Sequence, residues 1–136
     1  MRDNFMSKFV QYSLLIIAYL TENYSKNYIS LKDIAKEHNV SFAFLKQVAL
    51  NLKKKDVIES MEGVNGGYKL KNEPGKISLD TVIKAIEVEK IPYICKNKVK
   101  CSLSCFCQIK FAWEEAQVEA LKKLSRTKLD QFVEKK

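Results

Sequence analysis

Two short helices with serine caps, followed at once by a glycine-rich hairpin, constrain the fold of this chain more than any other feature. Ser30 and Ser41 each precede a stretch of helical apolar periodicity, which is where an N-cap serine stands. They predict helices over 31–37 and 42–54, joined by a turn around Asn39, a residue that tolerates left-handed backbone. Two short helices joined by such a turn form a helix-turn-helix unit.

A β-hairpin is predicted directly after the second helix. The residues 57–61 are β-prone, and 68–70 alternate again after a turn that holds Asn65, Gly66 and Gly67. These turn residues supply the positive φ that a tight hairpin connection requires. A hairpin in this place is a wing, so we expect a mainly α fold with a small β-hairpin wing.

The predicted elements divide the chain into three parts. Further helices are expected over 7–22, from about 77 to 90, over 108–124, and from Thr127 to Asp130, where the spacing of Thr and Asp is that of a helix start. We expect a winged helix-turn-helix DNA-binding domain over 1–90, a cysteine loop over 91–107, and a dimerisation helix with a short terminal helix over 108–136. A long helix that leaves its domain needs an apolar partner, and a second copy of the chain can provide it.

Composition excludes several other classes of protein. The 136 residues contain 24 Lys and Arg against 16 Asp and Glu, a net charge of +8 that favours nucleic acid as a partner. The longest apolar run, Leu14 to Leu20, is too short to span a bilayer, so we expect a cytoplasmic protein without membrane contact. There is one histidine and no nucleophile, base or phosphate-loop pattern, so we do not expect an enzyme.

The stretches Leu31–Ala35 and Phe44–Gln47, with the Gly66-Gly67-Tyr68 motif of the wing, resemble the bacterial IscR/NsrR/CymR family of winged-helix transcription regulators. The resemblance covers nearly the whole chain. It implies a homodimer that binds double-stranded promoter DNA, with repression as the expected effect. Many members of the family sense iron–sulfur, redox or nitric-oxide status through a cluster, whereas others lack the cysteines and bind a metabolic enzyme.

All four cysteines lie close together, at Cys95, Cys101, Cys105 and Cys107. The first, second and fourth reproduce the C-x5-C-x5-C spacing of the cluster-binding members, so the resemblance implies an iron–sulfur cluster, either 2Fe-2S or 4Fe-4S, on thiolate ligands. The family's histidine position holds Lys110 here, which leaves Cys105 as the candidate fourth ligand. Two cysteines two residues apart do not share a face of a helix, so both could bind one cluster only from irregular backbone.

Other readings of the cysteines stay open at this point. Four thiolates also suit a structural zinc ion, and neighbouring lysines would favour a metal-free thiol switch by lowering a thiol pKa. In either case the chain would be a regulator of the same fold, controlled by thiol oxidation or by a metabolic enzyme.

The outward face of the second helix of the helix-turn-helix unit is expected to read bases. IscR-type members have Glu where this chain has Lys46, and lysine pairs with guanine acceptors, so a different operator is expected. Lysines at the end of this helix are placed to reach phosphates, whereas Glu62 would repel them, which leaves wing contacts to Asn65, to backbone amides or to Lys69. The predicted DNA-binding residues are Ser41, Phe42, Ala43, Phe44, Lys46, Gln47, Lys53, Lys54, Asn65 and Gly66.

Overall fold

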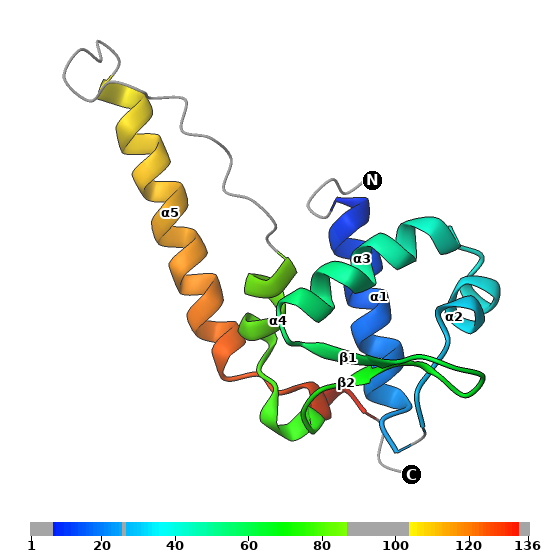
Figure 1. Ribbon diagram of the computed structural model, residues 1–136. Coiled ribbons are helices and arrows are strands. Elements are labelled where there is room, and N and C mark those ends of the chain that lie inside the picture. The colour runs from blue at the N-terminus through cyan, green and yellow to red at the C-terminus, as the bar shows by residue number, and fades with distance from the viewer. Residues whose placement is uncertain (1–6, 26, 87–103, 134–136) are drawn as a thin grey trace.

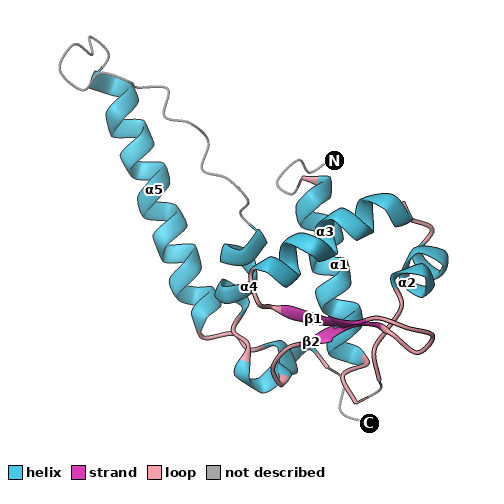
Figure 2. Ribbon diagram, in the orientation of Figure 1, coloured by secondary structure: helices cyan, strands magenta, loops and turns pink. Residues whose placement is uncertain are grey.

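The computed structural model describes residues 7–25, 27–86 and 104–133. Within them, helices form a compact group around one two-stranded hairpin, and one long helix projects away from that group (Figures 1 and 2). The elements are α1 (Lys8–Glu22), α2 (Leu31–His38), α3 (Phe42–Lys54), β1 (Ile58–Met61), β2 (Gly67–Leu70), the 3-10 helix η1 (Pro74–Lys76), α4 (Leu79–Ile86), α5 (Ser104–Ser125) and the 3-10 helix η2 (Leu129–Phe132). The predicted mainly α fold with a β-hairpin wing is confirmed.

The helix-turn-helix unit begins and ends where its caps predicted. The Ser30 hydroxyl accepts a hydrogen bond from the Lys32 amide at 3.2 Å, and the Ser41 hydroxyl accepts one from the Phe44 amide at 3.2 Å. Asn39 ends α2 with a φ of 52°, in the left-handed region. Local sequence therefore fixes both helices of the unit.

One hydrophobic core joins α1, α2, α3, the hairpin and α4. The inward stripe of α3 lies at its centre, packed between α1 on one side and β1 and α4 on the other. Burial of a whole apolar stripe fixes which face of α3 turns outward. The core residues that are shielded completely from solvent are Ile16, Ile34, Leu45, Val48, Ala49, Leu52, Leu70 and Val82.

The wing is tied back to the helices by a third backbone segment. β1 and β2 pair antiparallel, with Ile58 opposite Leu70, and Ile29 forms an additional bridge to Tyr68. The two amide–carbonyl bonds of that bridge are each 2.8 Å long. Positive φ occurs at Gly67, one of the three predicted turn residues, and also at Gly63, but not at Asn65 or Gly66. The connection is longer than a two-residue turn, which moves the left-handed positions to its ends.

Helix α5 begins at Ser104, four residues before the predicted start at 108. Of the predicted cysteine loop, 91–107, only the last four residues are described, and they are helical. Figure 1 shows the start of α5 far from the compact domain and its end beside α4. Among the described helices none is both long and apolar enough to cross a membrane.

A backbone clasp holds the end of α5 against the domain. The Leu79 amide donates to the Thr127 carbonyl at 2.8 Å, and the Leu129 amide donates to the Ile77 carbonyl at 3.0 Å. The Leu129 side chain is buried in the core. The prediction that Thr127 caps a terminal helix was wrong, because its backbone pairs with α4 and its hydroxyl donates back to Lys123; the terminal helix is η2, without a side-chain cap.

Candidate DNA-binding interface and cysteine segment

The first turns of α3 present a continuous outward surface. Phe42, Ala43, Lys46 and Gln47 are all exposed, as the sequence predicted from the opposite, buried stripe. Ser41 is exposed as well, with its oxygen already accepting the Phe44 amide and its hydroxyl hydrogen able to donate. In helix-turn-helix proteins the N-terminal residues of the second helix contact base edges in the major groove.

Phe44 stands apart from this set, because its ring turns inward. It meets the rings of Phe9 and Tyr12 edge-on, with centroid distances of 6.3 Å and 4.8 Å. The side chain is half-buried and packs against the core. Phe44 therefore anchors α3 to α1, a packing role that the sequence did not indicate.

Phe42 lies between two ammonium groups from different helices. The Nζ of Lys46 on α3 is 5.9 Å from the centre of the ring, and the Nζ of Lys32 on α2 is 6.0 Å from it. Both distances are within the range of a cation–π contact. Lys32 is a residue that the sequence did not single out, because its approach to Phe42 depends on how α2 crosses α3.

The carboxylates of α2 lie on its other side, toward α1. The Tyr19 hydroxyl donates to the Glu37 carboxylate at 2.8 Å. This bond, with partial burial and the negative charges of Glu37 and Asp33, raises the pKa of Tyr19 above its usual value. The acidic side of α2 thus faces Tyr19, while Lys32 faces the outward surface of α3.

The end of α3 combines exposed lysines with one structural amide. Lys53 and Lys54 are exposed, as expected of residues that reach phosphates. Asn51, between the two stripes, donates through Nδ2 to the carbonyl of Ala85 at 3.3 Å and so connects α3 to α4. The α4 contact holds the end of α3 in place while leaving the lysines at the surface.

The wing offers fewer polar contacts than the sequence suggested. Asn65 is exposed at the turn, whereas Gly66 is half-buried, and a side chain there would overlap the Met61 carbonyl. Lys69 does not extend from the hairpin, since its Nζ lies 5.9 Å from the ring centre of Tyr24 and 5.5 Å from that of Tyr28. The wing tip therefore presents Asn65 and backbone groups, together with the exposed Glu62 that was expected to repel phosphates.

Only half of the cysteine set lies in the part of the chain that the structure describes. Cys105 and Cys107 are free, exposed thiols near the start of α5, whereas Cys95 and Cys101 lie outside the described residues. Two residues along an α-helix correspond to a rotation of about 200°, so the two thiols project from opposite sides of α5. Lys110, the residue at the family's histidine position, forms an ion pair with Glu114 at 3.5 Å. The described residues contain no group of three metal-ligating side chains.

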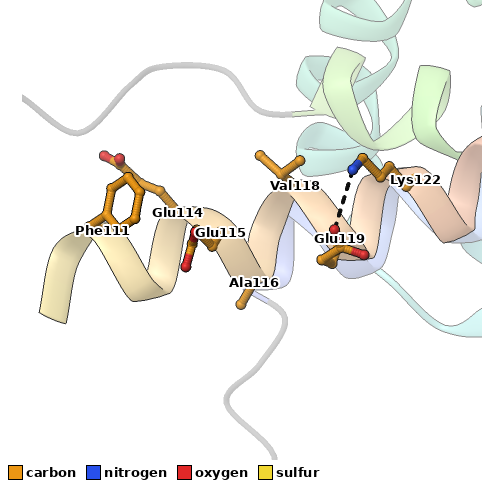
Figure 3. Close-up of a pocket in the computed structure, with 7 residues that line it drawn as sticks. All are labelled: Phe111, Glu114, Glu115, Ala116, Val118, Glu119 and Lys122. Atoms are coloured by element: carbon orange, nitrogen blue, oxygen red, sulfur yellow. Dashed lines mark hydrogen bonds and ion pairs between the residues drawn. The ribbon is translucent and has the colours of Figure 1, made fainter. Parts of the chain in front are cut away.

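The projecting part of α5 is exposed on every side. Ile109 and Trp113 are each 64% exposed although they are large and apolar. Figure 3 shows an open recess whose lining comes, among the described residues, from α5 alone, with Phe111 and Val118 beside glutamates and with Lys122 paired to Glu119 at 3.3 Å. Apolar side chains in such numbers on a free helix indicate a partner surface.

Comparison with known proteins gives one consistent answer. The Rrf2 family, described as iron-dependent transcriptional regulators, matches residues 6–135. The transcriptional regulator NsrR of Halalkalibacterium halodurans is 29% identical over 123 residues, which are 89% of this chain and 84% of that protein. The NsrR of Bacillus licheniformis is 30% identical over 113 residues, 82% of this chain and 79% of the relative.

Solved structures agree with the sequence relatives. The structure of Staphylococcus aureus CymR has a TM-score of 0.69 and 27% identity, covering 96% of this chain and 98% of that one, and its oxidised form has a TM-score of 0.70. The T. potens IscR structure has a TM-score of 0.71 at 24% identity, with 93% and 84% covered, and so bears on the fold. These relatives are regulators and not enzymes, and the resemblance seen in the sequence motifs is confirmed. The chain belongs to the Rrf2 family of transcriptional regulators.

Proposed function

We propose that this regulator binds promoter DNA as a homodimer through α3 and the wing, and that Cys95, Cys101 and Cys107 hold an iron–sulfur cluster that controls DNA binding. One observation carries the DNA-binding part. The inner stripe of α3 is completely buried, and its outer face presents the exposed Phe42, Ala43, Lys46 and Gln47 with lysines at the helix end. The core thus holds α3 in place, and its outer face is free to enter the major groove of DNA.

DNA binding is tested by its dependence on salt. Each lysine that neutralises a phosphate releases a counterion, so the affinity should fall steeply as salt is raised. Replacing Lys53 by Ala should reduce the slope of log affinity against log salt by about 1. Lys76→Ala, which changes another exposed lysine, on η1, is the matched control and should leave the slope unchanged. Salt-insensitive binding would contradict this assignment of α3.

Helix α5 is the proposed dimer contact. One side of it carries no charged residue from its start to Ala120, while Phe111 and Val118 lie on the opposite side among glutamates. A second copy of the chain, placed against the uncharged side, would bury the exposed Trp113 and Ile109. The uncharged side consists of Cys105, Ile109, Ala112, Trp113, Ala116 and Ala120.

Sedimentation measurements test the dimer and the side that it uses. Trp113→Glu would place a charge in the proposed contact and should shift the protein toward monomer. Val118→Glu changes another exposed apolar residue of α5, on the other side, and should leave the dimer intact. Dissociation by Val118→Glu alone would show that the recess side forms the contact instead.

The chemistry of the donor set fits an iron–sulfur cluster. Thiolates hold such clusters, and Cys107 is an exposed thiol at the end of the C-x5-C-x5-C pattern. Cys105 projects from the opposite side of the same helix, so the two thiols do not face one cluster together, and the C-x5-C-x5-C spacing favours Cys107 as the ligand in this segment. A bound cluster would supply a centre sensitive to oxidants and nitric oxide. The residues of α5 and its clasp would connect that centre to the winged domain, and a coupling of about 1–3 kcal/mol would change operator affinity several-fold to a hundredfold.

Anaerobic purification with a visible spectrum and iron and sulfide analysis tests the cluster. We expect Cys107→Ser to lose the colour, the iron and the acid-labile sulfide, and Cys105→Ser to retain them. Colourless wild-type protein without iron or sulfide would refute the cluster. Stoichiometric zinc in that protein would support the structural zinc site instead.

The second candidate is a regulator of the same fold controlled by oxidation of its thiols or by a metabolic enzyme. The exposure of both described thiols favours the oxidation version, and the CymR relative has itself been determined in an oxidised form. If metal-free protein loses DNA binding on mild oxidation and regains it with a thiol reductant, this candidate replaces the cluster.

A further inference from the structure

Phe42 is the most exposed aromatic residue on the helix-turn-helix unit, and nothing in the core accounts for it. It is the first residue of α3, and its side chain is 37% exposed. Phe44, in the same turn, is the aromatic residue that packs inward. The two rings therefore have different surroundings, and only the Phe42 ring lies where the helix would meet base edges.

The surroundings of Phe42 are cationic. Lys46 and Lys32 place their ammonium groups about 6 Å from its ring centre, one from each helix of the unit. The Glu37 carboxylate of α2 is directed to α1, where it accepts the hydroxyl of Tyr19 at 2.8 Å. An apolar ring flanked by two ammonium groups suits a surface that is apolar at one point and electronegative around it.

The major groove of DNA contains such a surface at one base. The C5-methyl of thymine is the apolar group exposed there, whereas guanine presents two acceptors, O6 and N7, and the backbone presents phosphates. The separation of 5.9 Å between the Lys46 ammonium and the ring centre is comparable to one or two base-pair steps of about 3.4 Å. The contact of Lys46 with the ring holds its ammonium near that position.

We propose that Phe42 recognises the C5-methyl of a thymine in each operator half-site, that Lys46 recognises a guanine one or two steps away, and that Lys32 contacts a neighbouring phosphate. This inference rests on the DNA binding proposed above. It identifies the bases that the outer face of α3 selects and assigns a DNA contact to α2.

The test removes one methyl group from the DNA. Operators are first selected by the full-length protein from a random pool, and each thymine of a half-site is then replaced in turn by uracil, which lacks only the methyl. At one position the replacement should weaken binding by the wild type about fourfold, the effect of burying one methyl group less. With Phe42→Ala the same replacement should have no further effect.

Phe132→Ala is the matched control. Phe132 is 59% exposed on η2, a segment that packs against η1 and lies apart from the start of α3 (Figure 1), so its removal should leave thymine and uracil distinguished as in the wild type. Lys46→Ala should relax the preference for guanine near the same thymine. Lys32→Ala should weaken binding equally for all sequences.

The inference is overturned if no thymine-to-uracil replacement affects the wild type, or if Phe42→Ala still distinguishes the two bases. These results differ from failure of the proposed function. If DNA binding itself were wrong, selection would enrich no sequence at all and the salt dependence would be absent. Circular dichroism of Phe42→Ala, expected to match the wild type, separates a lost contact from lost folding.

Discussion

Replacing Gly67 by Ala should destabilise the protein by about 3–5 kcal/mol. Gly67 has a φ of 150°, a conformation that costs other residues about 1–3 kcal/mol. A Cβ at this position would also overlap the backbone carbonyl of Ile29. β2 could then not stay so close to the backbone at Ile29, and the two 2.8 Å hydrogen bonds between Ile29 and Tyr68 would be lost. Each of these bonds contributes about 1 kcal/mol.

Gly63→Ala is the internal control for this prediction. Gly63 has a φ of 114°, yet a Cβ there would have no atom within 4 Å. It should therefore show the conformational cost alone, about 1–3 kcal/mol. Urea unfolding followed by circular dichroism gives both free energies of unfolding. If the Gly67 variant were no less stable than the Gly63 variant, the bridge to Ile29 would contribute nothing and the reasoning would be refuted.

Three further changes probe other contacts. Leu129→Ala removes a buried side chain from the α5 clasp and should lower the free energy of unfolding, measured in urea, by about 2–5 kcal/mol. A decrease below about 1 kcal/mol would show that the clasp is not part of the core. Asn51→Ala should lower the free energy of unfolding by about 1 kcal/mol in the same assay, because the Ala85 carbonyl loses the donor that lies 3.3 Å from it. An unchanged free energy would mean that water replaces the Asn51 amide as the donor. Tyr19→Phe removes the bond to Glu37. The raised pKa of Tyr19 means that the folded state holds this proton more tightly than the unfolded state. The stability advantage of the wild type should thus be constant below about pH 10 and should shrink above it, and an advantage that grew with pH would refute the assignment.

The sequence determined the local structure of the winged domain. The helices α2 and α3 were predicted closely because their caps and their apolar periodicity are properties of neighbouring residues. The same periodicity identified the outward residues Phe42, Lys46 and Gln47, since a helix that buries one stripe must expose the other. Family membership was also evident from short motifs of α2, α3 and the wing.

Tertiary structure decided which of those residues are available for recognition. Phe44 was predicted to read bases, yet it packs on Phe9 and Tyr12, and Lys69 was a candidate wing contact, yet it lies against Tyr24 and Tyr28. Lys32 joined the candidate interface through the crossing of α2 and α3. These contacts link residues distant in sequence, and no local pattern encodes the angle at which two helices meet.

The cysteine segment shows the same division. Its spacing indicated thiolate chemistry from the sequence alone. Because the helical backbone of α5 extends to Ser104, Cys105 and Cys107 lie on opposite sides of one helix. The spacing of cysteines in the sequence indicates which ligands are present. The conformation of the backbone between these cysteines determines which of them can approach one metal centre together.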